Sequence, residues 1–158
     1  MNRALIILSL LKNTTMNRTD FFNLLAIAKE KSGKSTNTVS FDLRMQWSTL
    51  RRFEKGNNNS NMQKIFDYLQ VINSHIQIDK VVIYNYENLL TWIIDARKKH
   101  SLSQRTLAKE AGCDHLTIAN VERKATIISI DTLLKIVDVL GYDIKIENND
   151  SFGISSKH

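Results

Sequence analysis

An internal repeat constrains the fold of this chain more than any other feature of its sequence. Residues 68 positions apart, as Glu54 and Glu122 are, resemble each other without a gap over most of the chain. Further identical pairs are Asn17/Asn85, Ala28/Ala96, Ser35/Ser103, Thr38/Thr106, Thr49/Thr117, Ile76/Ile144 and Ile78/Ile146. Apolar pairs include Leu43/Ala111, Met45/Cys113, Leu50/Ile118, Phe53/Val121, Ile65/Leu133, Leu69/Val137 and Ile72/Leu140. The pattern predicts two divergent copies of one module, near 17–80 and 84–150.

The composition favours helices. The chain has 158 residues, which suits two small domains, with 42% hydrophobic and 24% charged residues, a globular balance. It contains no proline and only five glycines, so a turn-rich sandwich of strands is disfavoured.

The net charge and the cysteine content indicate the kind of partner and the redox compartment of the protein. The net charge of +6 favours a polyanionic partner such as nucleic acid. Cys113 is the only cysteine, so neither an intrachain disulfide nor a cysteine zinc site is expected, and a reducing cytoplasm is indicated. We interpret Cys113 as a core residue.

The N-terminal stretch "MNRALIILSLLKN" leaves alternatives open. It has the charge and apolar run of a weak secretion signal but no small-x-small cleavage site. The other interpretations are an element packed on the body, or an upstream extension with Met16 as the true start. No stretch approaches the roughly 18 apolar residues of a membrane helix, so no membrane partner is expected.

Each copy is expected to have the same order of elements. A first helix is predicted over 20–31 and 87–99, a short second one from Ser35 or Ser103, and a third from near Gln46 or Asp114. A later helix follows Asn61 or Ser129, with apolar residues at helical spacing. Alternating residues then predict a strand over 75–84 and another over 142–147. These two strands are expected to pair antiparallel.

The stretch "SQRTLAKEAGCDHLTIANVERK" of the second copy predicts two helices joined by a sharp turn. Gly112 stands in the turn, where a left-handed backbone favours glycine. We expect Asp114 to cap the following helix and Glu122 to tie that helix to the next loop. Short or polar side chains would project from the start of the helix, as in a helix that reads the major groove.

With these residues, positions 85–147 resemble the Cro/lambda-repressor-like (XRE) helix-turn-helix family, and most of all its HipB-like antitoxin branch. The lead-in "IYNYENL" and the ending "YDIKIE" carry the likeness to that branch. The resemblance implies a mainly α fold of two tandem five-helix domains, the first of them degenerate, with terminal strands pairing into a small sheet. The expected boundaries are an extension at 1–16, domains at 17–83 and 84–148, and a flexible tail at 149–158.

The resemblance also implies which residues bind DNA. Gln104 would contact a phosphate and His115, Leu116, Asn120 and Ala119 would face bases, with Thr117 and Arg105 near the backbone of the DNA. Asn pairs with adenine and Leu meets a thymine methyl group. For His115, an ordinary exposed helix residue is the alternative.

The first copy departs from this pattern, because Arg44 stands at the glycine position of the turn. A positive φ there would cost about 1 kcal/mol, so the turn is shaped differently or the copy is degenerate. Its third helix still offers a set of outward side chains for DNA: Gln46, Trp47, Ser48, Arg51, Arg52 and Lys55. For Trp47, buttressing the fold or meeting a second protein are the alternatives.

Three functions are compatible with these features. The first is a transcriptional regulator, a repressor, that binds double-stranded DNA as a single-chain pseudo-dimer on two unlike half-sites. The second is an antitoxin that binds a toxin protein and regulates its own operon. In the third, the first copy is a protein-interaction module that never meets DNA. A homodimer of chains remains a further option, and no catalytic set, metal ligands or cofactor is expected.

Overall fold

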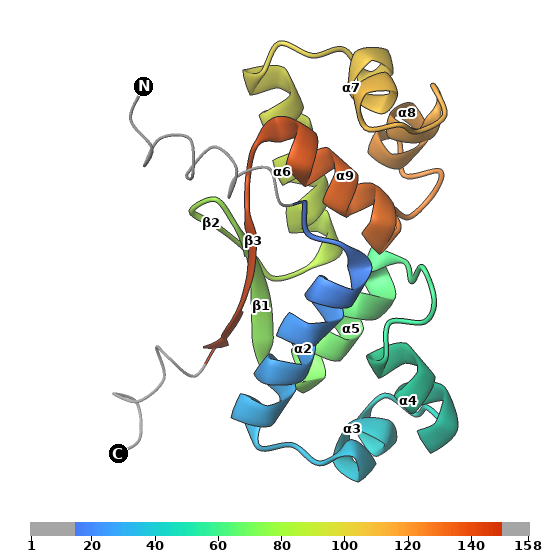
Figure 1. Ribbon diagram of the computed structural model, residues 1–158, viewed down its shortest axis with the longest axis vertical. Coiled ribbons are helices and arrows are strands. Elements are labelled where there is room, and N and C mark those ends of the chain that lie inside the picture. Colours follow the sequence, from blue (N-terminus) through green and yellow to red (C-terminus); the bar gives the residue numbers. More distant parts are fainter. Residues whose placement is uncertain (1–14, 150–158) are drawn as a thin grey trace, which may run out of the picture.

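The structure is a computed structural model and describes residues 15–149. The first half of the molecule, residues 17–78, comprises α2 (Arg18–Ser32), α3 (Thr36–Asp42), α4 (Trp47–Glu54), α5 (Met62–Val71) and β1 (Ser74–Ile78). After β2 (Val81–Ile83), the second half, residues 85–148, comprises α6 (Tyr86–Lys99), α7 (Gln104–Glu110), α8 (Thr117–Glu122), α9 (Ile130–Leu140) and β3 (Ile144–Asn148). Figure 1 shows the sheet along one side, α3 and α4 at one end, and α7 and α8 at the other.

The two halves start and end their helices with the same devices. The capping pairs Asn17/Asn85, Ser35/Ser103 and Asn61/Ser129 each accept a hydrogen bond from the backbone N–H three residues later. Left-handed backbone also recurs at the offset of 68: Gly33/Ser101, Arg44/Gly112, Gly56/Lys124 and Asn73/Gly141 all have positive φ. Among the described residues, only Asp79 has a positive φ without such a counterpart.

The turn of the first half therefore has the same left-handed residue as that of the second. Arg44 has a φ of 52° and Gly112 a φ of 68°. Ser40 replaces the small alanine of the second half and is accommodated because its hydroxyl donates to the Met45 carbonyl.

The prediction of a single strand over 75–84 is wrong in one respect: this stretch forms a hairpin of two strands, β1 and β2. The chain turns at Asp79 and Lys80, so that Ile78 pairs with Val81. Asp79 takes a φ of 56°, a conformation that Asp tolerates better than most residues. The three strands form an antiparallel sheet in the order β2-β1-β3.

The predicted antiparallel pairing between the two halves is confirmed, and it is symmetric. Gln77 faces Lys145 in the β1–β3 pair, and these two residues are equivalent at the offset of 68. A second contact repeats this symmetry near α5 and α9. The Met62 N–H donates to the Ile128 carbonyl at 2.8 Å, and the Ile130 N–H donates to the Ser60 carbonyl at 2.9 Å.

Two further expectations need correction. The resemblance implies five helices in each domain, but each half has four helices within residues 15–149, because the alternating residues after α5 and α9 extend into β1 and β3. The third helix of the second half begins at Thr117 rather than Asp114. Asp114 accepts a hydrogen bond from the Leu116 N–H, so it closes a turn in front of α8 and does not cap the helix.

The core is continuous through both halves. Equivalent apolar residues such as Leu50 and Ile118, or Ile65 and Leu133, are fully buried in one cluster. No helix between residues 15 and 149 is long and apolar enough to cross a bilayer. Residues 1–14 of the expected extension and 150–158 of the expected tail lie outside the described range.

Candidate nucleic-acid interface

A buried ion pair holds α8 in place. Arg97 of α6 donates two hydrogen bonds to the Glu122 carboxylate, each 2.8 Å long. A third bond from Arg97 reaches the Leu102 carbonyl in the α6–α7 connection. Glu122 therefore fixes α8 to α6, which corrects the expectation that it ties the helix to the following loop.

The residues predicted to bind DNA in the second half lie together on α7, on α8 and in the turn between them. His115, Leu116 and Arg105 are exposed, and Gln104, Thr117, Ala119 and Asn120 are half-buried. His115 and Leu116 precede α8 instead of standing on it, because the helix begins late. Leu116 is 52% exposed, a large apolar side chain left in water at the tip of the unit.

The turn in front of α8 carries mixed charge. His115 Nδ1 lies 3.6 Å from the Asp114 carboxylate, a contact that is an ion pair only when the histidine is protonated. Behind α8, the N–H groups of Ala125 and Thr126 both donate to the Asn120 carbonyl. These backbone bonds close the C-terminal end of α8, and the Asn120 residue itself is half-buried.

In the first half, α4 presents its side chains in a different way. Gln46, Trp47, Ser48, Arg52 and Lys55 are exposed, and Arg51 is half-buried. The Arg51 guanidinium lies 5.7 Å from the Trp47 ring centroid and 3.4 Å from the Glu54 carboxylate. Arg51 is thus held against its own helix, whereas Arg52 projects from it.

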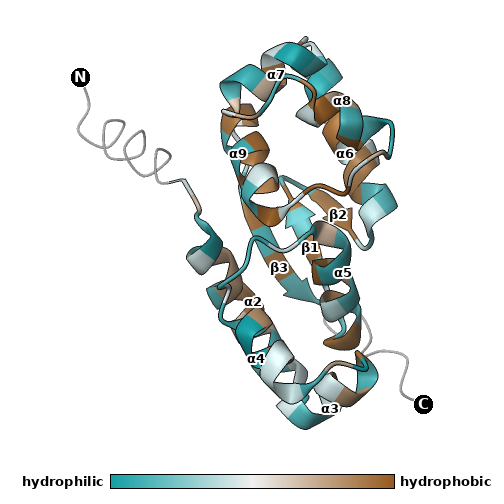
Figure 2. Ribbon diagram, turned by 90° about the vertical axis from the view of Figure 1, so that its right-hand side faces the viewer, coloured by the Kyte–Doolittle hydropathy of each residue, from teal (hydrophilic) through white to brown (hydrophobic). Residues whose placement is uncertain are grey.

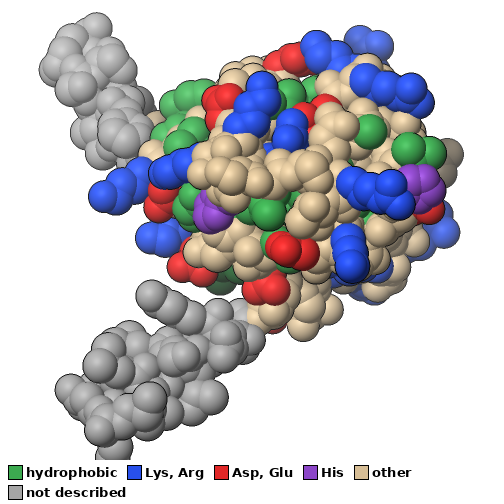
Figure 3. Space-filling model, turned by 90° about the horizontal axis from the view of Figure 1, so that it is seen from above, with side chains coloured by type: hydrophobic (Ala, Val, Ile, Leu, Met, Phe, Trp, Pro, Cys, Tyr) green, Lys and Arg blue, Asp and Glu red, His purple; other side chains and the backbone are tan. Residues whose placement is uncertain are grey.

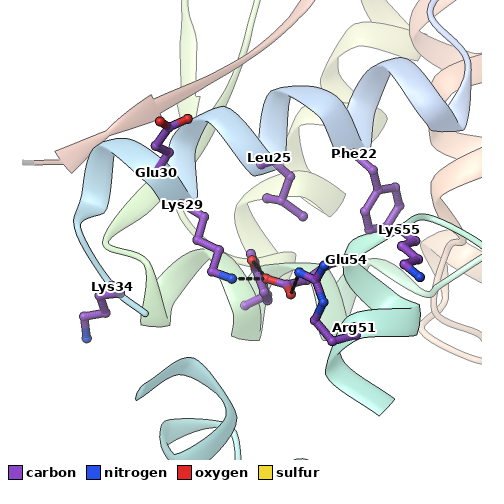
Figure 4. Close-up of a pocket in the computed structure, with 10 residues that line it drawn as sticks. Phe22, Leu25, Lys29, Glu30, Lys34, Arg51, Glu54 and Lys55 are labelled. Atoms are coloured by element: carbon purple, nitrogen blue, oxygen red, sulfur yellow. Dashed lines mark hydrogen bonds and ion pairs between the residues drawn. The ribbon is translucent and has the colours of Figure 1, made fainter. Parts of the chain in front are cut away.

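A polar network stands where Arg97 and Glu122 pair in the second half. Lys29 Nζ lies 2.7 Å from Glu54, and the Tyr68 hydroxyl donates to the same carboxylate at 2.6 Å. Figure 4 shows Lys29 and Glu54 beside a cavity of about 370 Å³ between α2, α4 and α5, which Tyr68 also lines. Burial, followed by the hydrogen bond to Glu54, raises the pKa of Tyr68, which stays protonated.

The outer end of the first half carries an aromatic patch, formed by Phe41 and Trp47. Phe41 is 83% exposed and Trp47 54%. Both line an open hollow of about 730 Å³ at the α3–α4 turn, together with Arg44. The equivalent position in the second half is Lys109, so the first half has an exposed aromatic ring where the second half has an exposed cation.

Three exposed cations beside these sites were not among the predicted residues. Arg44 lies in the first turn, and Arg123 and Lys124 follow α8. Lys124 pairs with Glu87 at 3.0 Å, so it is partly neutralised. The basic end of the quoted motif was a signal for the last two. Figure 3 shows Lys and Arg side chains over the end formed by α7 and α8, with acidic side chains between them.

Both helix pairs are carried on one side of the molecule. Figure 2, which looks onto that side, has α7 and α8 at one end and α3 and α4 at the other. The outer side of α7 is largely hydrophilic, and hydrophobic residues gather where α6, α8 and α9 meet. The two helix pairs therefore lie at opposite ends of the same side of the molecule.

Residues 93–146 match a family model described as helix-turn-helix, of the XRE type. The match runs from the middle of α6 into β3 and covers less than half of the chain, without extending to the first half. It confirms the helix-turn-helix expectation for the second half, and the family is one of DNA-binding regulatory domains. No curated protein and no solved structure matches the chain.

No group of three metal-binding side chains comes together within residues 15–149.

Proposed function

We propose that this protein is a sequence-specific DNA-binding transcription regulator, a repressor, in which α8 enters the major groove. The helix-turn-helix match over residues 93–146 carries this proposal. The exposed or half-buried side chains of His115, Leu116 and Asn120 support it, because such side chains at the start of a recognition helix reach base edges.

The chain would act as a single-chain pseudo-dimer made of two tandem domains. The repeated caps, the repeated left-handed residues and the two symmetric contacts between the halves support a tandem duplication. A dimeric helix-turn-helix protein reads two half-sites roughly 34 Å apart. Here α4 and α8 differ in sequence, so the operator would contain two unlike half-sites.

A selection of bound sequences from a random DNA pool tests both parts of this proposal. We expect two dissimilar half-sites one helical turn apart. The double variant Arg52→Ala/Lys55→Ala should weaken the sequence preference at one half-site and lower the salt dependence of binding. The control Lys64→Ala/Lys135→Ala, with one substitution in α5 and one in α9, should do neither. A chain that binds no DNA at low ionic strength would refute the proposed function.

The aromatic patch favours a second function for the first half. Phe41 and Trp47 are the kind of exposed anchors that bind another protein. The first half would then be a protein-interaction module, and an antitoxin that holds a toxin there is its most specific form. In that case Arg52→Ala/Lys55→Ala leaves DNA affinity unchanged and the selected site has a single recognisable half.

A further inference from the structure

A groove of about 420 Å³ runs between α6 and β2, away from the helix-turn-helix units. Trp92 and Ala96 line it from α6, and Val81 and Val82 line it from the sheet. β2 is the outermost strand, so its backbone edge on this side has no neighbouring strand within the described residues.

The first half shows what covers the equivalent helix face. There α2 packs against β3, and the Asn148 side chain donates to the Ala28 carbonyl at 3.2 Å. Ala28 corresponds to Ala96 and Asn148 corresponds to Lys80. Lys80 lies in the hairpin turn, where the chain leaves β1 for β2, so the face of α6 around Ala96 borders the groove instead of a strand.

The rim of the groove is apolar and exposed. Val81 is 46% exposed and Val82 37%, and these two residues are adjacent along β2. An edge strand with a row of exposed apolar residues is a site where an extended segment adds to a sheet. A segment placed between an edge strand and a helix gains backbone hydrogen bonds on one side and side-chain contacts on the other.

We propose that the occupant of this groove is the apolar segment at residues 4–11 of the same chain, "ALIILSLL". Its attachment point is adjacent. Met16 lines a neighbouring cavity together with Tyr142, and Tyr142 also lines the groove. The four residues between Leu11 and Met16 span up to roughly 14 Å when extended, enough to pass one side chain.

The chemistry of the segment matches the groove. Arg3 and Lys12 flank the apolar run, and no acidic residue occurs before Asp20. The groove contains Asp79 and Asp95 against the single cation Lys99. The basic residues that flank the segment are opposite in charge to the excess of acidic residues in the groove, and its apolar run matches the apolar lining. This inference does not rest on DNA binding.

The test uses Trp92 as a reporter in the full chain. The chain has two tryptophans, so a Trp47→Phe background leaves Trp92 alone. In this background, Ile6→Asn/Ile7→Asn removes two apolar side chains of the segment, and Ser9→Asn is the matched control. The measurements are quenching of Trp92 fluorescence by acrylamide and hydrogen exchange of the β2 amides.

We expect the double variant to speed exchange at β2 by roughly tenfold and to increase Trp92 quenching to a smaller extent, because Trp92 is only 7% exposed beside the open groove, with the Ser9→Asn chain unchanged. Asp95→Lys should have the same effect, and Asp67→Lys, an exposed position on α5, should have none. Equal quenching and exchange in all these chains would overturn the proposal. Protection that grows with protein concentration, together with a dimer in sedimentation, would place a second chain's segment in the groove and also overturn it.

Discussion

At the scale of single residues, the two turns share one backbone conformation but differ in the free energy that it costs. Arg44 and Gly112 have nearly the same left-handed conformation, with φ values of 52° and 68°. We predict that Arg44→Gly stabilises the protein by about 1 kcal/mol, because glycine lacks the Cβ that disfavours this region. Gly112→Ala should destabilise it by about as much, since a Cβ there meets nothing within 4 Å and only strain contributes. Thermal unfolding measures both, and shifts of equal sign would contradict this account.

A second residue-scale prediction concerns the proposed DNA contacts. Asn120 and Arg52 are equivalent at the offset of 68, and their side chains suit different bases, adenine for Asn and guanine for Arg. Asn120→Ala should weaken binding by about 1–3 kcal/mol at one half-site, which loses its preference for adenine. Arg52→Ala should affect a guanine in the other half-site. Competition with operators altered at one base pair measures each effect. If one variant lost both the adenine and the guanine preference, Asn120 and Arg52 would not act at separate half-sites.

At the scale of elements, the Arg97–Glu122 pair decides how α8 is held. The two side chains are only 12% and 7% exposed, so removal of one partner leaves a buried charge. Glu122→Ala should therefore cost about 3 kcal/mol or more of unfolding free energy. The matched control is Glu87→Ala, which breaks the exposed pair with Lys124 and should cost less than about 1 kcal/mol. Urea denaturation distinguishes them, and similar losses in both variants would show that Glu122 does not act through its buried partner.

At the scale of the whole molecule, an ion pair joins the two halves. Arg18 of α2 donates to both carboxylate oxygens of Asp131 in α9, at 2.9 and 2.7 Å. The hydrogen bonds from Arg18 lower the pKa of Asp131 below its ordinary value. The stabilisation is therefore complete above the unfolded-state pKa and is lost as the pH falls through the folded-state pKa.

It follows that Asp131→Asn should reduce stability at pH 7 and that the difference from the parent chain should shrink in acid, toward pH 3 and below. Urea denaturation across this range measures it, with Asp67→Asn on α5 as the control that leaves the pH profile unchanged. A difference that stays constant with pH would assign the effect to something other than the ion pair.

The continuous core gives one more prediction at this scale. Trp47 lies in the first half and Trp92 in the second, and one buried cluster runs through both. Because neither half closes its core without the other, the two should unfold together. Chains carrying only Trp47 or only Trp92 should show coincident denaturation curves. Ile76→Ala, in the central strand pair, should shift both curves equally, and separate midpoints would mean that the halves are independent domains.

The sequence by itself determined most of the helices and their caps and the left-handed residue Gly112, since these depend on side chains within one turn of the position concerned. Asn17 and Ser103 cap from local geometry, and Gly141 ends α9 because only a residue without a Cβ takes its conformation freely. The periodic burial of residues such as Leu50 and Ile118 also followed from spacing alone. The helix-turn-helix of the second half, which the family match over residues 93–146 supports, was predicted from the same kind of local pattern.

Tertiary structure alone decided the rest. The hairpin at Asp79 is part of a sheet in which β2 and β3 pair with opposite edges of β1, and the partner of Glu122 is a residue 25 positions earlier that no local pattern indicates. Two local features also escaped prediction: Arg51 lies against Trp47 and Glu54 of its own helix, and α8 begins late because Asp114 closes a turn in front of it. These features arise from contacts between elements distant in sequence or from the balance of competing side chains, and their energies exist only once the chain has folded.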